Sequence, residues 1–417
     1  MRAFEYSAPV ISSANAGDMT DQHAPLHPLL RRREGHHARV TYEELFFDLV
    51  YVFAVTQLSH ELLHNLTVIG VFETLILWFA VWLGWQYTCW TTNWFDPETP
   101  RIRGMIFTLM LLGLVMTSAI PEAFGERGWV FALAYVAIQV GRTAFITFQL
   151  GRNHQLAANH RRMLAWLLVS AVFWIAGAFV EPEARMILWA IAILCEYGSP
   201  MIGFAFPGLG RSTTRDWTVD GGHLAERCQL FVIVALGETL LATGAMLTEA
   251  HPWDASIMLA LLATFLGTLA MWWLYFGTSS QDATDAITTS PDPGGMGAKF
   301  HYVHAILVAG VIATAVGNDL VMDLPHDMLA VPQALILLGG PAIYLVGSAV
   351  YKRVVYGAIP LSHLAGVIAL AVLFPVALAV DLLAMGWLTT LVLLGVGIWE
   401  GLALRRRRAL APATASH

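Results

Sequence analysis

The chain has 417 residues, of which 57% are hydrophobic and only 13% are charged. Soluble domains carry roughly 25% charged residues, so this composition is too poor in charge for several soluble domains and too apolar for a disordered protein. The formal net charge of −7 excludes the global basic field of a nucleic-acid-binding protein, and we expect no nucleic-acid partner. We therefore predict an all-α polytopic membrane protein whose main partner is the lipid bilayer.

Long apolar segments begin only near Leu45, and the N-terminal region has no apolar core typical of a cleavable signal peptide. We predict disordered cytoplasmic tails over 1–40 and, rich in arginine, over 406–417. Between the tails, stretches of about 20 mainly apolar residues are long enough to cross the hydrocarbon as helices. Twelve segments are predicted to span the membrane: 45–64, 69–94, 103–123, 128–150, 162–181, 185–206, 227–248, 255–278, 299–322, 328–350, 361–381 and 385–404.

The distribution of basic residues predicts the orientation of these segments, because cytoplasmic connections are enriched in Lys and Arg. With the N-terminus inside, twenty of the 23 basic residues fall on the cytoplasmic side, Arg227 and Lys352 among them. Arg127 and Arg185 fall on the opposite side, and Arg142 lies inside a segment. We therefore expect both termini to be cytoplasmic.

The chain also shows signs of an internal duplication. The first segment opens with Glu43-Glu44 followed by an aromatic and aliphatic run, and the seventh opens with Glu226-Arg227 followed by a similar run. Six segments per unit would give both units the same orientation, related by an axis along the membrane normal. We predict a first six-helix half over 41–206, a cytoplasmic linker over 207–225 and a second six-helix half over 226–405.

Ionisable side chains inside the first predicted half indicate a functional centre, because such groups are costly within a membrane. Glu44 and Asp48 are four residues apart, which places both carboxylates on one face of a helix. Arg142 lies roughly 12 Å from the inner end of its segment and keeps its charge at any ordinary pH. Asp48 is the predicted partner of Arg142, either in a functional site or in a structural ion pair.

The second half carries Glu226 and Arg227 at the corresponding edge and Glu238 about 18 Å deeper. Helical spacing places Arg227 and Glu238 on one face, so this face connects the edge of the membrane to its centre. A carboxylate at mid-membrane is a candidate carrier of a proton or cation. The alternative is a protonated Glu238 that is hydrogen-bonded to a neighbouring helix.

His301 and His304 lie one turn apart on one helix face at the start of the ninth segment. Metal sites in helix bundles add carboxylates in a Glu-x-x-His pattern, which is absent near these histidines. We expect a pair that shares protons or hydrogen bonds, with no metal and no cofactor. The sequence also contains no phosphate-binding loop or nucleophile elbow, so catalytic residues stay unknown.

Two stretches carry a resemblance to a known family. Polar residues recur within otherwise apolar runs over 44–60 (ELFFDLVYVFAVTQLSH) and 226–238 (ERCQLFVIVALGE). The chain resembles, over roughly residues 40–400, the bacterial low temperature requirement protein A family. This resemblance implies a multi-pass protein of the bacterial inner membrane, and it implies no established substrate or reaction.

Two hypotheses follow for the function. The first is a transporter or permease-like protein, with proton coupling as one option, for an unidentified small molecule or ion. Its polar centre would open to the cytoplasm, and we expect a cavity between the halves that reaches Glu238 from that side. The predicted substrate- or proton-binding residues are Glu44, Asp48, Arg142, Glu226, Arg227, Glu238, His301 and His304. The alternative is a membrane-embedded enzyme that acts on a lipid or quinone.

Overall fold

The computed structural model describes residues 27–31, 38–151, 154–213, 217, 219–250, 252–278 and 280–410. Within these ranges the regular elements are helices, and β structure is limited to three isolated bridges, such as Leu30 with Phe95. Most of the tail predicted over 1–40, together with residues 411–417, lies outside the described residues. The helices of the described residues agree with the predicted all-α class.

The first seven α-helices form one group, in which short capped connections separate long apolar helices. Thr41 caps α1 by accepting a hydrogen bond from the Glu44 amide, while proline occupies the first turn of α3 and of α7. A π-helical turn, η2, joins α4 to α5 without interrupting the span. The helices are α1 (Tyr42–His64), α2 (Val68–Trp94), α3 (Pro100–Ser118), η1 (Ile120–Glu122), α4 (Gly128–Val136), η2 (Ala137–Gly141), α5 (Arg142–Leu150), α6 (Gln155–Ala178) and α7 (Pro182–Met201).

The second group begins at α8, which Asp220 caps, and contains two short helices besides the long ones. Pro375 occupies the first turn of α14, at the point where α13 ends. The helices are α8 (Gly221–Glu249), α9 (Ala255–Phe276), α10 (Ser280–Thr288), α11 (Pro293–Asp323), α12 (Val331–Tyr356), α13 (Leu361–Val372), α14 (Phe374–Ala377) and α15 (Leu382–Leu410).

Each of the twelve predicted spans coincides with a helix or with consecutive helices. In the described part of the chain, nine spans are long and apolar enough to cross a membrane, α4, η2 and α5 counting as one span. The exceptions are α1, which carries several carboxylates, α7, and the interrupted pair α13 and α14. The protein is therefore a multi-pass helical membrane protein, and the count of twelve stays a prediction.

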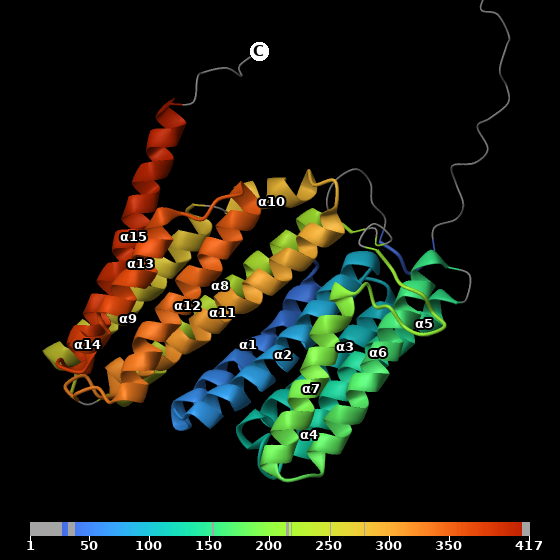
Figure 1. Ribbon diagram of the computed structural model, residues 1–417, viewed down its shortest axis with the longest axis horizontal. Coiled ribbons are helices and arrows are strands. Elements are labelled where there is room, and N and C mark those ends of the chain that lie inside the picture. The colour runs from blue at the N-terminus through green and yellow to red at the C-terminus, as the bar shows by residue number, and fades with distance from the viewer. Residues whose placement is uncertain are drawn as a thin grey trace, which may run out of the picture.

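The two groups lie side by side, with α1 and α2 next to α11 (Figure 1). Within each group the helices pack in the same cyclic order. In the first group α1 contacts α2 and α3, α3 contacts α4, α4 contacts α6, α6 contacts α7, and α7 returns to α2. In the second group α8 contacts α9 and α11, α11 contacts α12, α12 contacts α13, α13 contacts α15, and α15 returns to α9.

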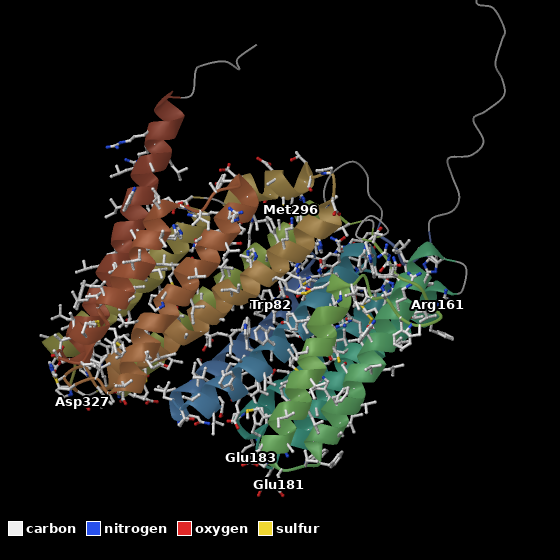
Figure 2. The ribbon with its side chains drawn as sticks, viewed as in Figure 1. Trp82, Arg161, Glu181, Glu183, Met296 and Asp327 are labelled. Atoms are coloured by element: carbon white, nitrogen blue, oxygen red, sulfur yellow. The ribbon has the colours of Figure 1, made fainter. Side chains whose placement is uncertain are left out.

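The two ends of the bundle are distinct. Arg161 and Met296 lie at one end, Glu181, Glu183 and Asp327 at the other, and Trp82 between them (Figure 2). We call the end with Met296 the linker end, because the connection between the groups lies there. Asn93 at the end of α2 donates a hydrogen bond of 2.8 Å to the Asp220 carbonyl, which fixes the start of α8 at this end.

Glycine allows an unusually close approach of α11 and α12. A Cβ atom placed on Gly340 would lie 2.6 Å from the Thr314 backbone nitrogen, and one placed on Gly310 would lie 2.4 Å from that of Tyr344. Small residues allow such backbone proximity between membrane helices. The neighbouring Gly339 faces open space instead.

The Gly340→Ala substitution is expected to destabilise the protein by about 1–3 kcal/mol, because the added methyl group forces the two backbones apart. Gly339→Ala is the matched control and is expected to be neutral or slightly stabilising, since alanine is the better helix former. Thermal denaturation of the purified variants in detergent measures both. Equal stability of the two variants would show that the α11–α12 contact is not close.

Candidate functional site

Buried charges connect α1 to α8 near the linker end. The Arg227 guanidinium of α8 forms ion pairs with Glu44 at 3.0 Å and with Asp48 at 2.6 Å, both on α1. All three side chains are at most 2% exposed. The i, i+4 spacing of the carboxylates places both on the α1 face toward α8, while Phe46 and Leu49 on the same helix are exposed.

Two further residues, Arg31 and His223, contact Glu44. We call the whole cluster the ion network; it consists of Arg31, Glu44, Asp48, His223 and Arg227. Glu44 also contacts the Arg31 guanidinium at 2.6 Å and the His223 Nε2 atom at 2.9 Å. The two arginines therefore balance the two carboxylates, as a buried charge requires.

Trp85 of α2 holds the inner edge of the ion network. Its indole Nε1 donates a hydrogen bond of 2.8 Å to Asp48, and its ring lies 5.9 Å from the Arg227 guanidinium carbon. The indole thus contacts both the anion and the cation. The second oxygen of Asp48 is buried without a hydrogen-bond partner among the described residues, so the carboxylate retains capacity to accept a proton or a ligand donor.

The predicted ion pair between Asp48 and Arg142 is wrong, because Arg227 occupies the carboxylate of Asp48. Arg142 instead donates hydrogen bonds to the Thr88 hydroxyl at 3.1 Å and to the Gly84 carbonyl at 3.3 Å. In the described part of the chain no carboxylate lies within 4.0 Å of its guanidinium. Arg142 lies directly after the π-helical turn η2, and such turns are frequent at functional sites.

Arg142 is connected to a buried carboxylate through Gln139 and Tyr135. Gln139 accepts a hydrogen bond from Arg142 and donates one of 3.0 Å to the Tyr135 hydroxyl, which in turn donates to Glu196 of α7. Ser170 and Trp174 also donate to Glu196, at 2.7 Å and 3.0 Å. Glu196 is therefore held by neutral donors within the first group.

Glu238 lies eleven residues beyond Arg227 on α8, which is roughly 16 Å deeper at the α-helical rise. It is 5% exposed, and its carboxyl group lies near Thr56 of α1. Asp319 of α11 is equally buried and lies close enough to interact electrostatically with Glu238. Sequence reasoning missed Asp319, although an aspartate inside the apolar segment 299–322 was a visible signal. We call Glu238 and Asp319 the acidic pair.

The two predicted histidines of α11 face different groups of helices. His301 packs against Trp85 and Trp90 of α2, with ring centroids 5.7 Å and 5.9 Å apart. His304 shares a hydrogen bond of 2.6 Å with the Tyr275 hydroxyl of α9. No cluster of three or more potential metal ligands occurs among the described residues. Glu226 is half-buried beside Arg227.

A further buried pair lies within the second group. Lys352 of α12 is 1% exposed and forms an ion pair with Glu400 of α15. Its ammonium also donates a hydrogen bond of 2.8 Å to Thr278, and His363 lies 3.9 Å from Glu400. Assigning Lys352 to a cytoplasmic connection was therefore wrong. The signal was Glu400, a carboxylate inside the last apolar segment that requires a cation.

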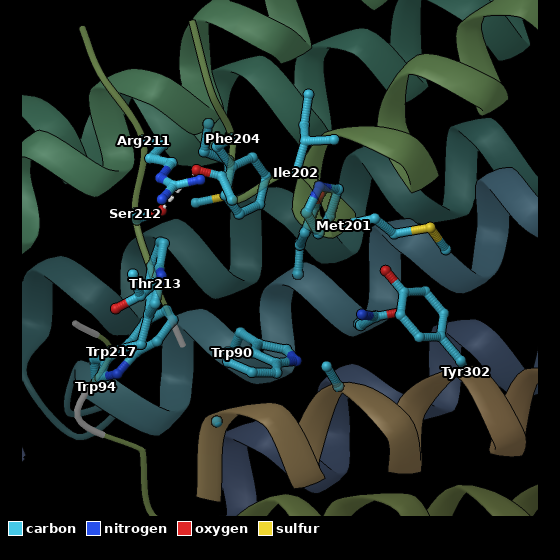
Figure 3. Close-up of a pocket in the computed structure, with 17 residues that line it drawn as sticks. Trp90, Trp94, Met201, Ile202, Phe204, Arg211, Ser212, Thr213, Trp217 and Tyr302 are labelled. Carbon is cyan, nitrogen blue, oxygen red and sulfur yellow. Dashed lines mark hydrogen bonds between the residues drawn. The ribbon is translucent and has the colours of Figure 1, made fainter. Parts of the chain in front are cut away.

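A cavity of about 450 Å³ opens at the linker end beside the ion network (Figure 3). Its walls come from α2, α6, the end of α7, the linker and the first turns of α11. The predicted route to Glu238 is not observed, since Glu238 does not line this cavity. The residues that line it include Gln86, Trp90, Trp94, Phe204, Arg211 and Trp217.

The chain is similar to one protein family and to a protein of Rhizobium meliloti. The family described as bacterial low temperature requirement A protein matches residues 39–398. The uncharacterized protein RA0937 of Rhizobium meliloti (strain 1021) is 38% identical to the chain over 402 residues, which cover 95% of this chain and 96% of that protein. No solved structure matches the chain.

Proposed function

Because the chain belongs to the bacterial low temperature requirement A family and buries charges between two groups of membrane helices, we propose that it is a secondary transporter. It would move a small molecule or ion across the bacterial inner membrane, with proton coupling. The observation that carries this proposal is the ion network. It joins α1 of the first group to α8 of the second through Glu44, Asp48 and Arg227.

Two polar layers lie along the same helices, α1 and α8. Substrate and coupling-ion sites of transporters lie at the interface between structural repeats. Here the ion network occupies the linker end of that interface, and the acidic pair lies deeper, with Glu238 near Thr56 and within electrostatic range of Asp319. Two buried carboxylates within electrostatic range of each other favour the binding of a proton by one of them. Glu238 is therefore the proposed coupling carboxylate, with Asp319 as its partner.

We propose supporting roles for the remaining predicted site residues. His301 has a buried Nε2 atom without a hydrogen-bond partner in the described structure, and it packs against Trp85, so it can accept a proton next to the ion network. Arg142 provides a buried positive charge next to the cavity residue Tyr87, with its guanidinium 5.5 Å from that ring. His304 shares a hydrogen bond with Tyr275 within the second group and Glu226 is half-buried, and we propose only a structural role for them.

The repeated order of helix contacts supports a duplicated architecture. We propose that 41–206 and 226–405 are two related six-helix units with twelve spans in total and both termini in the cytoplasm. An even number of spans per unit gives the two units the same orientation. The linker end would then be the cytoplasmic end, which is consistent with the excess of Lys and Arg in the connections predicted on that side.

The proposal is tested with the purified chain in proteoliposomes. We expect vesicles loaded at alkaline pH and diluted into acidic buffer with a bacterial small-molecule extract to accumulate at least one compound, read by mass spectrometry of the filtered vesicles. A protonophore should abolish the accumulation, and protein-free vesicles are the control. If the protein-containing vesicles accumulate nothing beyond the protein-free vesicles, secondary transport coupled to protons is contradicted.

A further inference from the structure

We propose that the cavity at the linker end binds a planar aromatic carboxylate. The ligand class would be the substrate class of the proposed transporter, and in that respect the inference rests on the proposed function. Binding of the ligand to the cavity is tested separately. A cavity of about 450 Å³ is within the size range of small-molecule sites. The identity of the ligand class follows from the walls, the unpaired polar atoms and the charge.

Aromatic rings form most of one wall. The rings of Trp94 and Trp217 lie 5.0 Å apart, and the ring of Phe204 lies 6.0 Å from that of Trp217. Trp90 closes the wall toward α11, with its ring 5.7 Å from that of Trp94 (Figure 3). Flat π-surfaces at several angles favour a planar aromatic ligand, which can stack on one ring and meet another edge to face.

Two residues of this wall each have a buried polar atom without a hydrogen bond in the described structure. The Oε1 atom of Gln86 and the indole Nε1 of Trp90 are buried and have no hydrogen-bond partner among the described residues. The Gln86 side chain is 4% exposed, so bulk water does not satisfy it. Buried polar groups in folded proteins are nearly always hydrogen-bonded. A ligand with a polar substituent on its ring would supply the missing partner.

The charge on the cavity wall favours an anion. Arg211 is the charged member of the described lining, and no acidic side chain belongs to it. Ser212 and Thr213 lie beside Arg211, and the Ser212 hydroxyl donates a hydrogen bond of 3.1 Å to the Gly203 carbonyl (Figure 3). A guanidinium with its parallel N–H groups matches a carboxylate in geometry. The cavity thus combines an aromatic interior with an anion-binding rim.

The cavity is linked to the ion network by a chain of three side chains. Trp90 lines the cavity and contacts His301, His301 contacts Trp85, and Trp85 donates to Asp48. A ligand stacked on Trp90 therefore changes the packing around His301. This contact would couple occupancy of the cavity to the charges between the two groups.

Binding is measured by isothermal titration of the detergent-purified full chain with 1-naphthoate. We expect saturable binding that is about tenfold tighter than for the uncharged 1-naphthamide, because a charge-assisted contact is worth about one decade in affinity. Cyclohexanecarboxylate keeps the charge without the aromatic plane and should also bind more weakly. No saturable binding of 1-naphthoate, or equal affinity for the three probes, would overturn the proposal.

Two variants with matched controls locate the site. Arg211→Gln should remove the preference for 1-naphthoate over 1-naphthamide, whereas Arg101→Gln, an exposed arginine outside the cavity lining, should preserve it. Trp90→Leu should weaken both aromatic probes, whereas the exposed Trp129→Leu should weaken neither. Unchanged affinities in both cavity variants would place the binding elsewhere and contradict the assignment. Binding at this site without uptake of 1-naphthoate would leave the aromatic-anion site standing and contradict its assignment as the transport substrate.

Discussion

The Arg227→Gln variant is expected to lose about 3–5 kcal/mol of folding free energy, because removal of one partner leaves buried carboxylates without their cation. Arg227 is 0% exposed and forms ion pairs with both Glu44 and Asp48. Arg31 contacts only the outer carboxylate, so it cannot compensate for the loss at Asp48. Denaturation of the purified variant in detergent, followed by circular dichroism, measures the effect.

An exposed ion pair at the same end provides the control for this prediction. Arg103 is paired with Glu43 at 2.7 Å, and its side chain is 42% exposed. Arg103→Gln should therefore cost no more than about 1 kcal/mol. Adding Asp48→Asn to Arg227→Gln should recover much of the lost stability, since Arg31 then balances the remaining carboxylate of Glu44. Equal losses in the two single variants would show that the ion network is not buried.

The second large effect is expected at Lys352. Lys352→Met should also cost about 3–5 kcal/mol, because Glu400 and the Thr278 hydroxyl lose the ammonium that they contact within the helix bundle. The neighbouring Arg353 is exposed, so Arg353→Met should change stability by less than about 0.5 kcal/mol. The same denaturation assay measures the stability of both variants. A Lys352→Met variant as stable as Arg353→Met would contradict burial of the pair.

Hydrophobic length predicted the helices well, because a span needs about 20 apolar residues whatever its neighbours are. The apolar length of a segment does not indicate which helices it packs against. Arg227 could be assigned from sequence to the edge of a span, yet its pairing with Asp48 depends on the contact between α1 and α8. Asp48 was therefore assigned to Arg142, the basic residue that lay inside a predicted span.

The errors at Lys352 and Asp319 have a common physical origin. Counting basic residues assumes that those near helix ends reach water, but Lys352 lies inside α12 and faces Glu400. Asp319 lies only three residues before the end of the predicted segment 299–322, where a carboxylate is expected to reach the interface. Burial depends on the neighbouring helices, which only the tertiary structure reveals. The aromatic cavity likewise combines residues from 86 to 302 in the sequence.

The most direct test of the account compares Glu238→Gln with Glu249→Gln in proton-driven uptake. Both glutamates belong to α8, but Glu238 is buried within electrostatic range of Asp319, whereas Glu249 is exposed at the helix end. For the compound that wild-type vesicles accumulate, Glu238→Gln should abolish the stimulation by an inward proton gradient while exchange without a gradient persists. Glu249→Gln should behave as wild type. Full gradient-driven accumulation by Glu238→Gln would contradict the coupling role.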